Sequence, residues 1–334
     1  MTLTRIVCLA LLLCSGPVAG ETIALVSDLN GRYGSTSYND RVNTAIEHIL
    51  QLRPGLVIST GDMVAGQKQP RLDQEWLDSM WQAFNITVAD PLADAGIPFV
   101  VTPGNHDGSG LAGFQLERER FEAQWRQRNP GLEILPGSEW PRRYAARLGD
   151  VLLLSFDGTR PGRLPAEERA FVKRMLQEHS QTAAVTVAYS HLPMWPLARG
   201  REREILDDAA LLTLMHRYGV DVYASGHHHV HFAGIDEAGM VHLGVGALGG
   251  NARAFSGEDQ RQPHSFALIE WADGVLEVQS RRAPDFRDEV FTERMPQTIN
   301  GPLGRLRRLD GPTAFRLPAK EQPTTQQSSE IVHD

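Results

Sequence analysis

The sequence predicts an α/β fold, in which a parallel sheet carries helices on its faces. From residue 22 to about residue 102, short apolar runs alternate with helical patterns, and the runs stop at acidic or amide-bearing residues. The composition agrees, because a chain of 334 residues that is 41% hydrophobic and 22% charged is typical of a globular protein with a large core. The length suits one large domain or two small ones.

Five apolar runs are predicted to be buried strands, at residues 23–26, 56–58, 99–101, 185–188 and 220–223. Helices are predicted over residues 39–52 and about 72–95, where apolar residues recur on one face. Strands that alternate with helices favour parallel pairing, because the helix crosses over one face of the sheet.

The second half of the chain predicts further elements. Residues 108–136 are predicted to be a polar, partly helical segment between strands. Residues 143–147 and 151–156 are predicted to form a hairpin. Helices over about 165–178 and 203–218 lead into two of the buried strands. Strands at 241–245, 266–271 and 275–278 are expected to form a second, mixed sheet.

Both ends of the chain differ from its middle. Residues 1–20 combine Arg5, a short apolar stretch and small residues, which indicates a secretory signal peptide and export to the periplasm or medium. The apolar stretch is shorter than the ~20 residues of a membrane span, so a membrane anchor is the weaker reading and no span is expected in the mature chain. Residues 21–296 are expected to form the main domain, and 297–334 a largely irregular tail.

Cysteine and charge restrict the chemistry. Cys8 and Cys14 both lie in the predicted signal peptide, so a metal in the mature protein would need nitrogen and oxygen ligands. A net charge of −8 argues against nucleic-acid binding, which needs a basic face, but not against a phosphorylated small molecule. The sequence does not indicate an oligomeric state.

Polar residues follow the predicted strands, and they are the most informative feature of the chain. They are Asp28, Asp62, Asn105, His106, Asp107, His191, His227 and His229. Because the carboxyl ends of parallel strands open onto one edge of a sheet, these side chains are expected to meet there. Carboxylates, an amide and imidazoles together suit a pair of transition-metal ions. The alternative is that they are turn residues, helix caps and a histidine-rich surface loop.

Within this set, individual roles can be assigned. His106 is suited to protonating a leaving oxygen or stabilising phosphoryl charge, and Asp107 to orienting that imidazole. His227 and His229 would share one side of an extended segment, which leaves His228 and His231 as spare imidazoles. A polar loop with Arg32 and Tyr33, and the arginines at 199, 201 and 203, are candidate substrate contacts, or else ordinary solvated residues.

These motifs resemble the five blocks of the calcineurin-like metallophosphoesterases: Asp28, Gly61-Asp62, Gly104-Asn105-His106-Asp107, His191 and Gly226-His227-x-His229. The resemblance spans about residues 22–281. It implies a double β-sandwich flanked by helices and a dinuclear Mn, Fe or Zn centre. One metal would be held by Asp28, Asp62 and His229, and the other by Asp62, Asn105, His191 and His227. A metal-bound hydroxide would attack phosphorus in line, with His106 as the catalytic histidine.

The first block departs from the family pattern, which usually reads Asp-x-His. Here it is Asp28-Leu29-Asn30. Asn30 is either a weak oxygen ligand or a turn residue, since Asn-Gly is a strong turn dipeptide. In both cases the first metal is expected to bind more loosely.

The sequence therefore predicts an exported, metal-dependent phosphatase or phosphodiesterase that acts on a phosphorylated small molecule. Two other functions stay open. One is a binding protein on the same fold that has lost turnover, which Asn30 favours and the intact His106 and Asp107 oppose. The other is a metal-storage protein built on the histidine cluster.

Overall fold

A computed structural model describes residues 21–272, 275–310 and 313–316. The predicted signal peptide and the last part of the predicted tail lie outside these residues. Within them, no helix is long and apolar enough to cross a membrane.

The first of two sheets has six strands in the order β15-β12-β11-β1-β2-β3. Its parallel half consists of β1 (Glu21–Val26), β2 (Leu56–Ser59) and β3 (Phe99–Val101). Its antiparallel half consists of β11 (Ser265–Ala272), β12 (Val275–Arg282) and β15 (Thr313–Arg316). The sheet thus joins the two ends of the described chain.

The second sheet has nine strands in the order β13-β14-β9-β10-β8-β7-β6-β5-β4. Four neighbouring strands are parallel: β6 (Val151–Ser155), β7 (Val185–Tyr189), β8 (Val222–Ser225) and β10 (Val241–Gly244). Antiparallel strands flank them: β4 (Glu133–Ile134), β5 (Tyr144–Leu148), β9 (Phe232–Ile235), β13 (Thr298–Gly301) and β14 (Gly304–Arg308).

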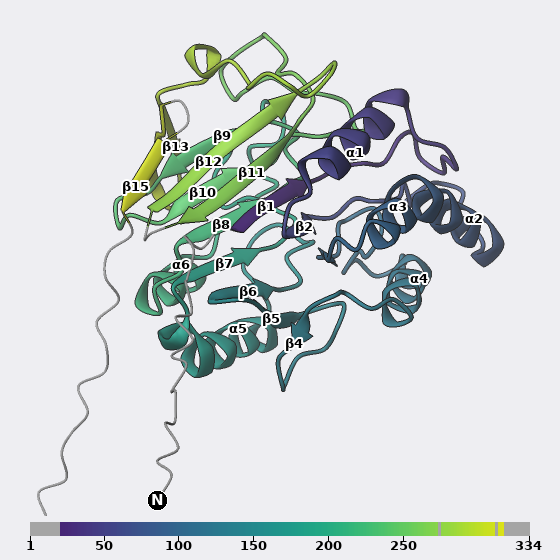
Figure 1. Ribbon diagram of the computed structural model, residues 1–334, viewed down its shortest axis with the longest axis horizontal. Coiled ribbons are helices and arrows are strands. Elements are labelled where there is room, and N and C mark those ends of the chain that lie inside the picture. Colours follow the sequence, from purple (N-terminus) through teal and green to yellow (C-terminus); the bar gives the residue numbers. More distant parts are fainter. Residues whose placement is uncertain (1–20, 273–274, 311–312, 317–334) are drawn as a thin grey trace, which may run out of the picture.

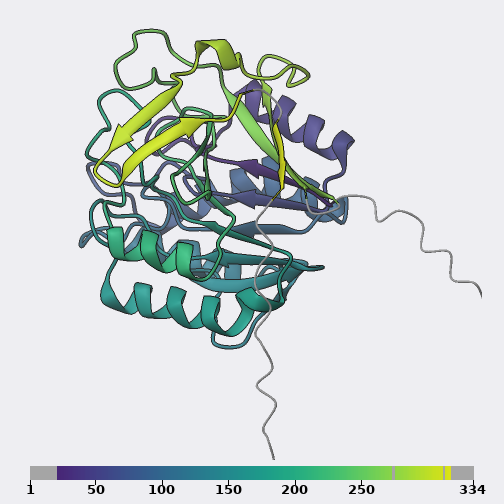
Figure 2. The same cartoon turned by 90° about the vertical axis from the view of Figure 1, so that its left-hand side faces the viewer.

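Helices cover the outer faces of both sheets (Figure 1, Figure 2). Those beside the first sheet are α1 (Asp40–Leu52), α2 (Gln74–Phe84), a π-helical turn (Asn85–Ala89), α3 (Asp90–Asp94) and α4 (Gln115–Arg126). Those beside the second are α5 (Ala166–His179) and α6 (Ala209–Arg217). Short 3-10 turns occur at Ser180–Thr182 and Thr292–Arg294.

The core forms three apolar layers between these elements. Strand residues such as Leu25 and Val187 alternate inward and fill the space between the two sheets. A second layer packs β1–β3 against α1, α2 and α4, and a third packs the second sheet against α5 and α6. The result is a four-layer αββα architecture, which confirms the predicted double β-sandwich flanked by helices.

Helix α1 shows how local sequence produces this packing. Asn39 caps its first turn by accepting a hydrogen bond from the Val42 amide at 3.2 Å. Its buried residues, Val42, Ala45, Ile46 and Ile49, follow helical spacing and face the first sheet. The predicted range of residues 39–52 therefore matches the helix with its cap.

One prediction about the C-terminal third is wrong, and a second does not hold for the described residues. The strands at 241–245, 266–271 and 275–278 do not form a sheet of their own, because β10 joins the second sheet while β11 and β12 join the first. Within the predicted tail, the described residues 297–310 and 313–316 are not largely irregular, because β13, β14 and β15 lie there. In this arginine-rich segment, Ile299 and Leu306 are the buried residues of the β13–β14 hairpin. One apolar residue per strand is too weak a pattern to detect.

Candidate metal centre

Asp28 and Asp62 lie directly after β1 and β2, side by side at one edge of the first sheet. The Asp28 amide donates to the Gly61 carbonyl at 3.1 Å, which ties the two loops together. Gly226, from the second sheet, packs against this pair, and a Cβ at that position would lie 2.7 Å from Asp28 Oδ2. Only glycine allows this approach.

Backbone strain is concentrated at the site. Seven non-glycine residues of the described chain have positive φ, and four of them are Asp28, Asp62, His227 and His229, at 49°, 56°, 61° and 56°. Such conformations cost of order 1–3 kcal/mol each and persist where the surrounding structure enforces them. The strain aims these side chains over the sheet edge.

Three histidines are oriented by contacts on the ring nitrogen that faces away from the site. His191 Nδ1 lies 2.8 Å from the Thr60 carbonyl, and His229 Nδ1 lies 2.7 Å from the Asn251 carbonyl. His227 Nε2 lies 2.7 Å from a Glu204 carboxylate oxygen. A carbonyl or carboxylate can only accept, so each of these nitrogens donates, and each ring in its neutral form presents a lone pair at its other nitrogen.

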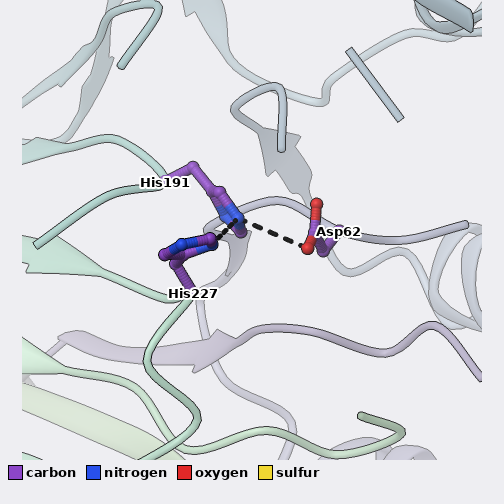
Figure 3. A group of neighbouring side chains, drawn as sticks. All are labelled: Asp62, His191 and His227. Atoms are coloured by element: carbon purple, nitrogen blue, oxygen red, sulfur yellow. Dashed lines mark hydrogen bonds and ion pairs between the residues drawn. The ribbon is translucent and has the colours of Figure 1, made fainter. Parts of the chain in front are cut away.

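The lone pair of His191 meets three other ligand atoms. Its Nε2 lies 2.9 Å from Asn105 Oδ1, 3.2 Å from His227 Nδ1 and 3.4 Å from Asp62 Oδ2. Figure 3 shows His191 between Asp62 and His227, and their ligand atoms all lie within 4.8 Å of one another. Atoms that bind one ion at about 2.0–2.2 Å are separated by roughly 3.0–3.6 Å, so this group fits a single metal ion.

A second group of ligand atoms lies beside the first. His229 Nε2 is 2.9 Å from Asp28 Oδ1, which is buried and accepts no hydrogen bond from any described residue. The other oxygen, Oδ2, accepts from Ser27 Oγ at 2.6 Å and from the His227 amide at 2.9 Å. The unused oxygen of Asp28 therefore points at an imidazole lone pair. Asn30 is nearly buried at the same edge and lines the cavity.

The electrostatics of the site favour a cation. Burial lowers the pKa of His191, but the carboxylates of Asp62 and Asp28 outweigh burial and raise it to about 9. Burial raises the pKa of Asp28, but His229, His191 and the hydrogen bond from Ser27 outweigh it and hold the pKa well below its usual value. The carboxylates thus stay ionised and attract positive charge, whether a proton or a metal.

His106 lies at the cavity wall, and the prediction that Asp107 orients it is wrong. His106 Nδ1 faces the Gly66 carbonyl at 3.2 Å, and its ring packs against Tyr33 at 5.0 Å between centroids. Asp107 is buried and accepts from the amides of Met63 and Gly104, both at 2.6 Å. Met63 lies in the loop after β2 and Gly104 in the loop after β3, so the Asp107 carboxylate joins these two loops.

An open cavity of about 780 Å³ lies over both groups of ligand atoms. Of the predicted substrate contacts, Arg32, Tyr33 and Arg201 line it, whereas Arg199 pairs with Asp259 elsewhere. Arg203 is exposed and does not line it. A loop over residues 245–264 adds Asn251 and Arg253.

Sequence reasoning missed several residues of this site. Glu204, Asn251 and Arg253 lie in loops without periodicity, and only the folded loops bring them to the centre. The spare imidazoles have structural places: His228 Nδ1 accepts from the amides of Leu197 and Ala198 at 3.1 and 3.2 Å, and His231 is buried. The Gly249-Gly250 pair is a sequence signal for the loop that carries Asn251 and Arg253, because glycine permits close approach. A Cβ at Gly249 would meet the Leu29 carbonyl, and one at Gly250 would meet the His229 ring.

Comparisons with known proteins give one family match. The family model described as calcineurin-like phosphoesterase matches residues 21–231. A comparison with curated proteins finds no match.

Several solved structures share the fold at low identity. The purple acid phosphatase PPD1 from yellow lupin (Lupinus luteus) seeds is 16% identical, with a TM-score of 0.62 over 82% of this chain and 53% of that chain. A dimetal phosphatase from Danio rerio is 14% identical, with a TM-score of 0.56 over 84% and 100%. GAP50, the anchor in the inner membrane complex of Plasmodium, is 15% identical, with a TM-score of 0.57 over 92% and 91%. This chain thus spans about half the length of the lupin protein.

Proposed function

The chain belongs to the calcineurin-like phosphoesterase family, and on that premise we propose that it hydrolyses phosphoester bonds with two metal ions bound at the candidate centre. The observation that carries this proposal is the convergence of imidazole lone pairs on carboxylate oxygens at 2.9 and 3.4 Å. While the imidazoles are neutral, lone pairs and negative charges at such distances repel one another, and a proton or a metal ion between them removes the repulsion. A cation between them would turn repulsion into coordination.

We assign the donor set to two ions, of which the group Asp62, His191 and His227 would hold one. All its members lie at one edge of the sheets and offer oxygen or nitrogen: Asp28, Asp62 and His229 for the first ion, and Asp62, Asn105, His191 and His227 for the second. Asp62 would bridge the two. Asn30 is a candidate additional ligand of the first ion. Mixed oxygen and imidazole ligands suit Mn, Fe or Zn.

The chemistry follows from this arrangement and from His106. When bound, the ions would polarise a water molecule and neutralise the phosphoryl oxygens. His106 donates from Nδ1 to the Gly66 carbonyl, so its Nε2, 3.8 Å from Asp62 Oδ2, would donate to the phosphoryl group or the leaving oxygen when the ring carries its second proton. Tyr33 covers one face of the ring.

The substrate class is a phosphorylated small molecule. The cavity has the volume of a small-molecule site, and arginines line it although the chain as a whole carries a net charge of −8. Export belongs to the same proposal, on the strength of the apolar and small residues within 1–20.

The test is hydrolysis of 4-nitrophenyl phosphate and bis(4-nitrophenyl) phosphate by the purified protein with Mn²⁺. We expect turnover that falls by at least about 100-fold in His106→Ala, the lower end of the range for a general acid. The ratio of the two rates would separate a monoesterase from a diesterase. His179→Ala is the matched control, since His179 lies on α5 away from the cavity.

The other candidate is a catalytically impaired binding protein on the same fold, which Asn30 favours because it stands where the family pattern has histidine. Bound metal without turnover above that of His106→Ala would decide for it. Asn30→His would then be expected to tighten the first metal and to raise turnover.

A further inference from the structure

Positive charge gathers on the wall of the cavity beside the metal centre. Arg32, Arg201 and Arg253 line this cavity, whereas the only ionisable carboxylate among its lining residues is the proposed ligand Asp62. The net charge of the chain is −8, so this concentration of arginine does not follow from composition. The positive charge of the bound metal ions would already neutralise the negative charge of one phosphoryl group. The three arginines would supply positive charge in addition to that of the ions.

Arg253 is the most unusual of the three. Its side chain is partly buried, and its Nε is buried without a hydrogen-bond partner among the described residues. It forms no ion pair within the part of the chain that the structure describes. Burial lowers its pKa, and so does the nearby charge of Arg201. A guanidinium that is desolvated beside another cation is costly unless an anion joins them.

Arg201 is held in place by Glu204, which also contacts the proposed ligand His227. It pairs with Glu204, and the same Glu204 oxygen lies 2.7 Å from His227 Nε2. This single carboxylate therefore pairs with both a ligand histidine and Arg201, and it forms no ion pair with Arg253, which lies near enough only to feel its charge.

The loops that carry Arg201 and Arg253 are joined through their backbones. The Arg199 amide donates to the Ala254 carbonyl at 3.0 Å, and Ala198 forms a β-bridge with Phe255. The Gln262 amide donates to the Arg253 carbonyl at 2.7 Å and closes the base of the second loop. The two guanidinium groups are thus presented to one cavity by a connected backbone rather than by two independent loops.

We propose that Arg201 and Arg253 form a subsite for a second anionic group of the substrate, so that the preferred substrates are phosphate esters that also carry a phosphate or carboxylate. This inference rests on the proposed function. The planar guanidinium groups can bind either anion through paired hydrogen bonds. A cavity of about 780 Å³ has room for both ends of such a molecule.

The test compares three substrates that share one scaffold: propyl phosphate, 3-phosphooxypropanoate and propane-1,3-diyl bisphosphate. We expect the second anion to raise kcat/KM in the wild type. Arg253→Gln should reduce that advantage on the order of 10- to 100-fold, the worth of a charge-assisted hydrogen bond, and leave propyl phosphate within about threefold. The bisphosphate and the carboxylate separate the two kinds of anion.

Two variants control the experiment. Arg203→Gln removes an exposed arginine two residues from Arg201 that does not line the cavity, and it should change none of the three rates. Arg253→Lys keeps the charge but not the paired donors, and it should restore part of the advantage. A variant that lowers all three rates equally, or a wild type that gains nothing from the second anion, overturns the subsite.

Binding without turnover gives an independent readout. Chelator-treated protein should bind inorganic pyrophosphate more tightly than orthophosphate by calorimetry, and Arg253→Gln should remove the difference. Equal binding of the two anions by the wild type counts against the subsite. Absence of hydrolysis for all three esters would refute the proposed function, whereas the calorimetry would still decide for or against the subsite.

Discussion

At the scale of single residues, the site depends on buried groups that hold the metal-binding side chains and their loops in position. Asp107 does so by holding the amides of Met63 and Gly104 at 2.6 Å. Burial, and then the nearby Asp62, raise its pKa to about 7. A sequence neighbour of His106 thus acts on the backbone of two loops and not on the imidazole.

Glu204→Gln should weaken metal binding about 10- to 100-fold, as loss of an outer-shell carboxylate commonly does. The carboxylate accepts from His227 Nε2 at 2.7 Å and fixes the tautomer that leaves Nδ1 free for a metal. Titration with Mn²⁺ followed by calorimetry measures the change. Glu202→Gln is the control, because Glu202 is exposed and contacts Ser256. Unchanged affinity in Glu204→Gln would refute this role.

Gly226→Ala should lower the free energy of unfolding by about 1–3 kcal/mol, the usual cost of overpacking. A Cβ there would lie 1.9 Å from Ser27 Oγ and 2.7 Å from Asp28 Oδ2. Urea denaturation measures the effect. Gly55→Ala, where the nearest atom is 3.7 Å away, should cost no more than about 0.5 kcal/mol. Equal losses in both variants would contradict the argument.

At the scale of elements, a buried carboxylate joins α6 to β9 and β10. Asp236 Oδ2 lies 2.7 Å from His216 Nε2 in α6 and 3.0 Å from His242 Nε2 in β10. Burial raises the pKa of Asp236, but the hydrogen bonds and charges of the two imidazoles outweigh it and lower the pKa to about 2. The pairing stabilises the fold only while this carboxylate is ionised.

Asp236→Asn should therefore lower stability at neutral pH, and the difference from the wild type should shrink in acid. The folded pKa is depressed below the ordinary value of 3.8, so this contribution is complete above about pH 4 and is lost as pH falls toward 2. Urea midpoints at pH 7, 4 and 2.5 measure it. Asp259→Asn, at an exposed ion pair, should show a small and pH-insensitive difference. A constant deficit in Asp236→Asn would contradict the assignment.

The elements that the sequence predicts best are those with strong local patterns. Residues 99–101 match β3, and the hairpin at 143–147 and 151–156 matches β5 and β6 within one residue. The partner of a strand is not local: β11 pairs with β1 across some 240 residues, and this pairing decides which sheet it joins. Candidate ligands were found because they follow strands, whereas Glu204 and Arg253 reach the cavity through irregular loops.

At the scale of the whole molecule, the candidate ligands are divided between the two sheets. Asp28, Asp62 and Asn105 follow β1, β2 and β3, whereas His191, His227 and His229 follow β7 and β8. The site therefore exists only where both sheets are docked on their shared apolar layer.

Saturating Mn²⁺ should raise Tm, and a chelator should reverse the rise. At a free metal concentration of 100 times Kd, one site adds about 2.7 kcal/mol, which for a chain of this size corresponds to roughly 5 °C. Differential scanning calorimetry measures it. Asp62→Asn should lose most of the shift and His106→Ala should keep it. A shift that survives in Asp62→Asn would place the metal elsewhere.

The division of the ligands also sets an order of events during folding. Neither sheet alone carries all the proposed ligands, so a refolding chain acquires high metal affinity only once the two sheets have docked. In a stopped-flow refolding experiment, uptake of metal from a metal-sensitive dye would therefore report the rate at which the two sheets dock. The far-UV circular dichroism signal of the helices would be expected to appear earlier. In a protein that folds in the presence of metal, the metal would therefore stabilise the docked sheets after they form, and it would not direct the earlier steps of folding.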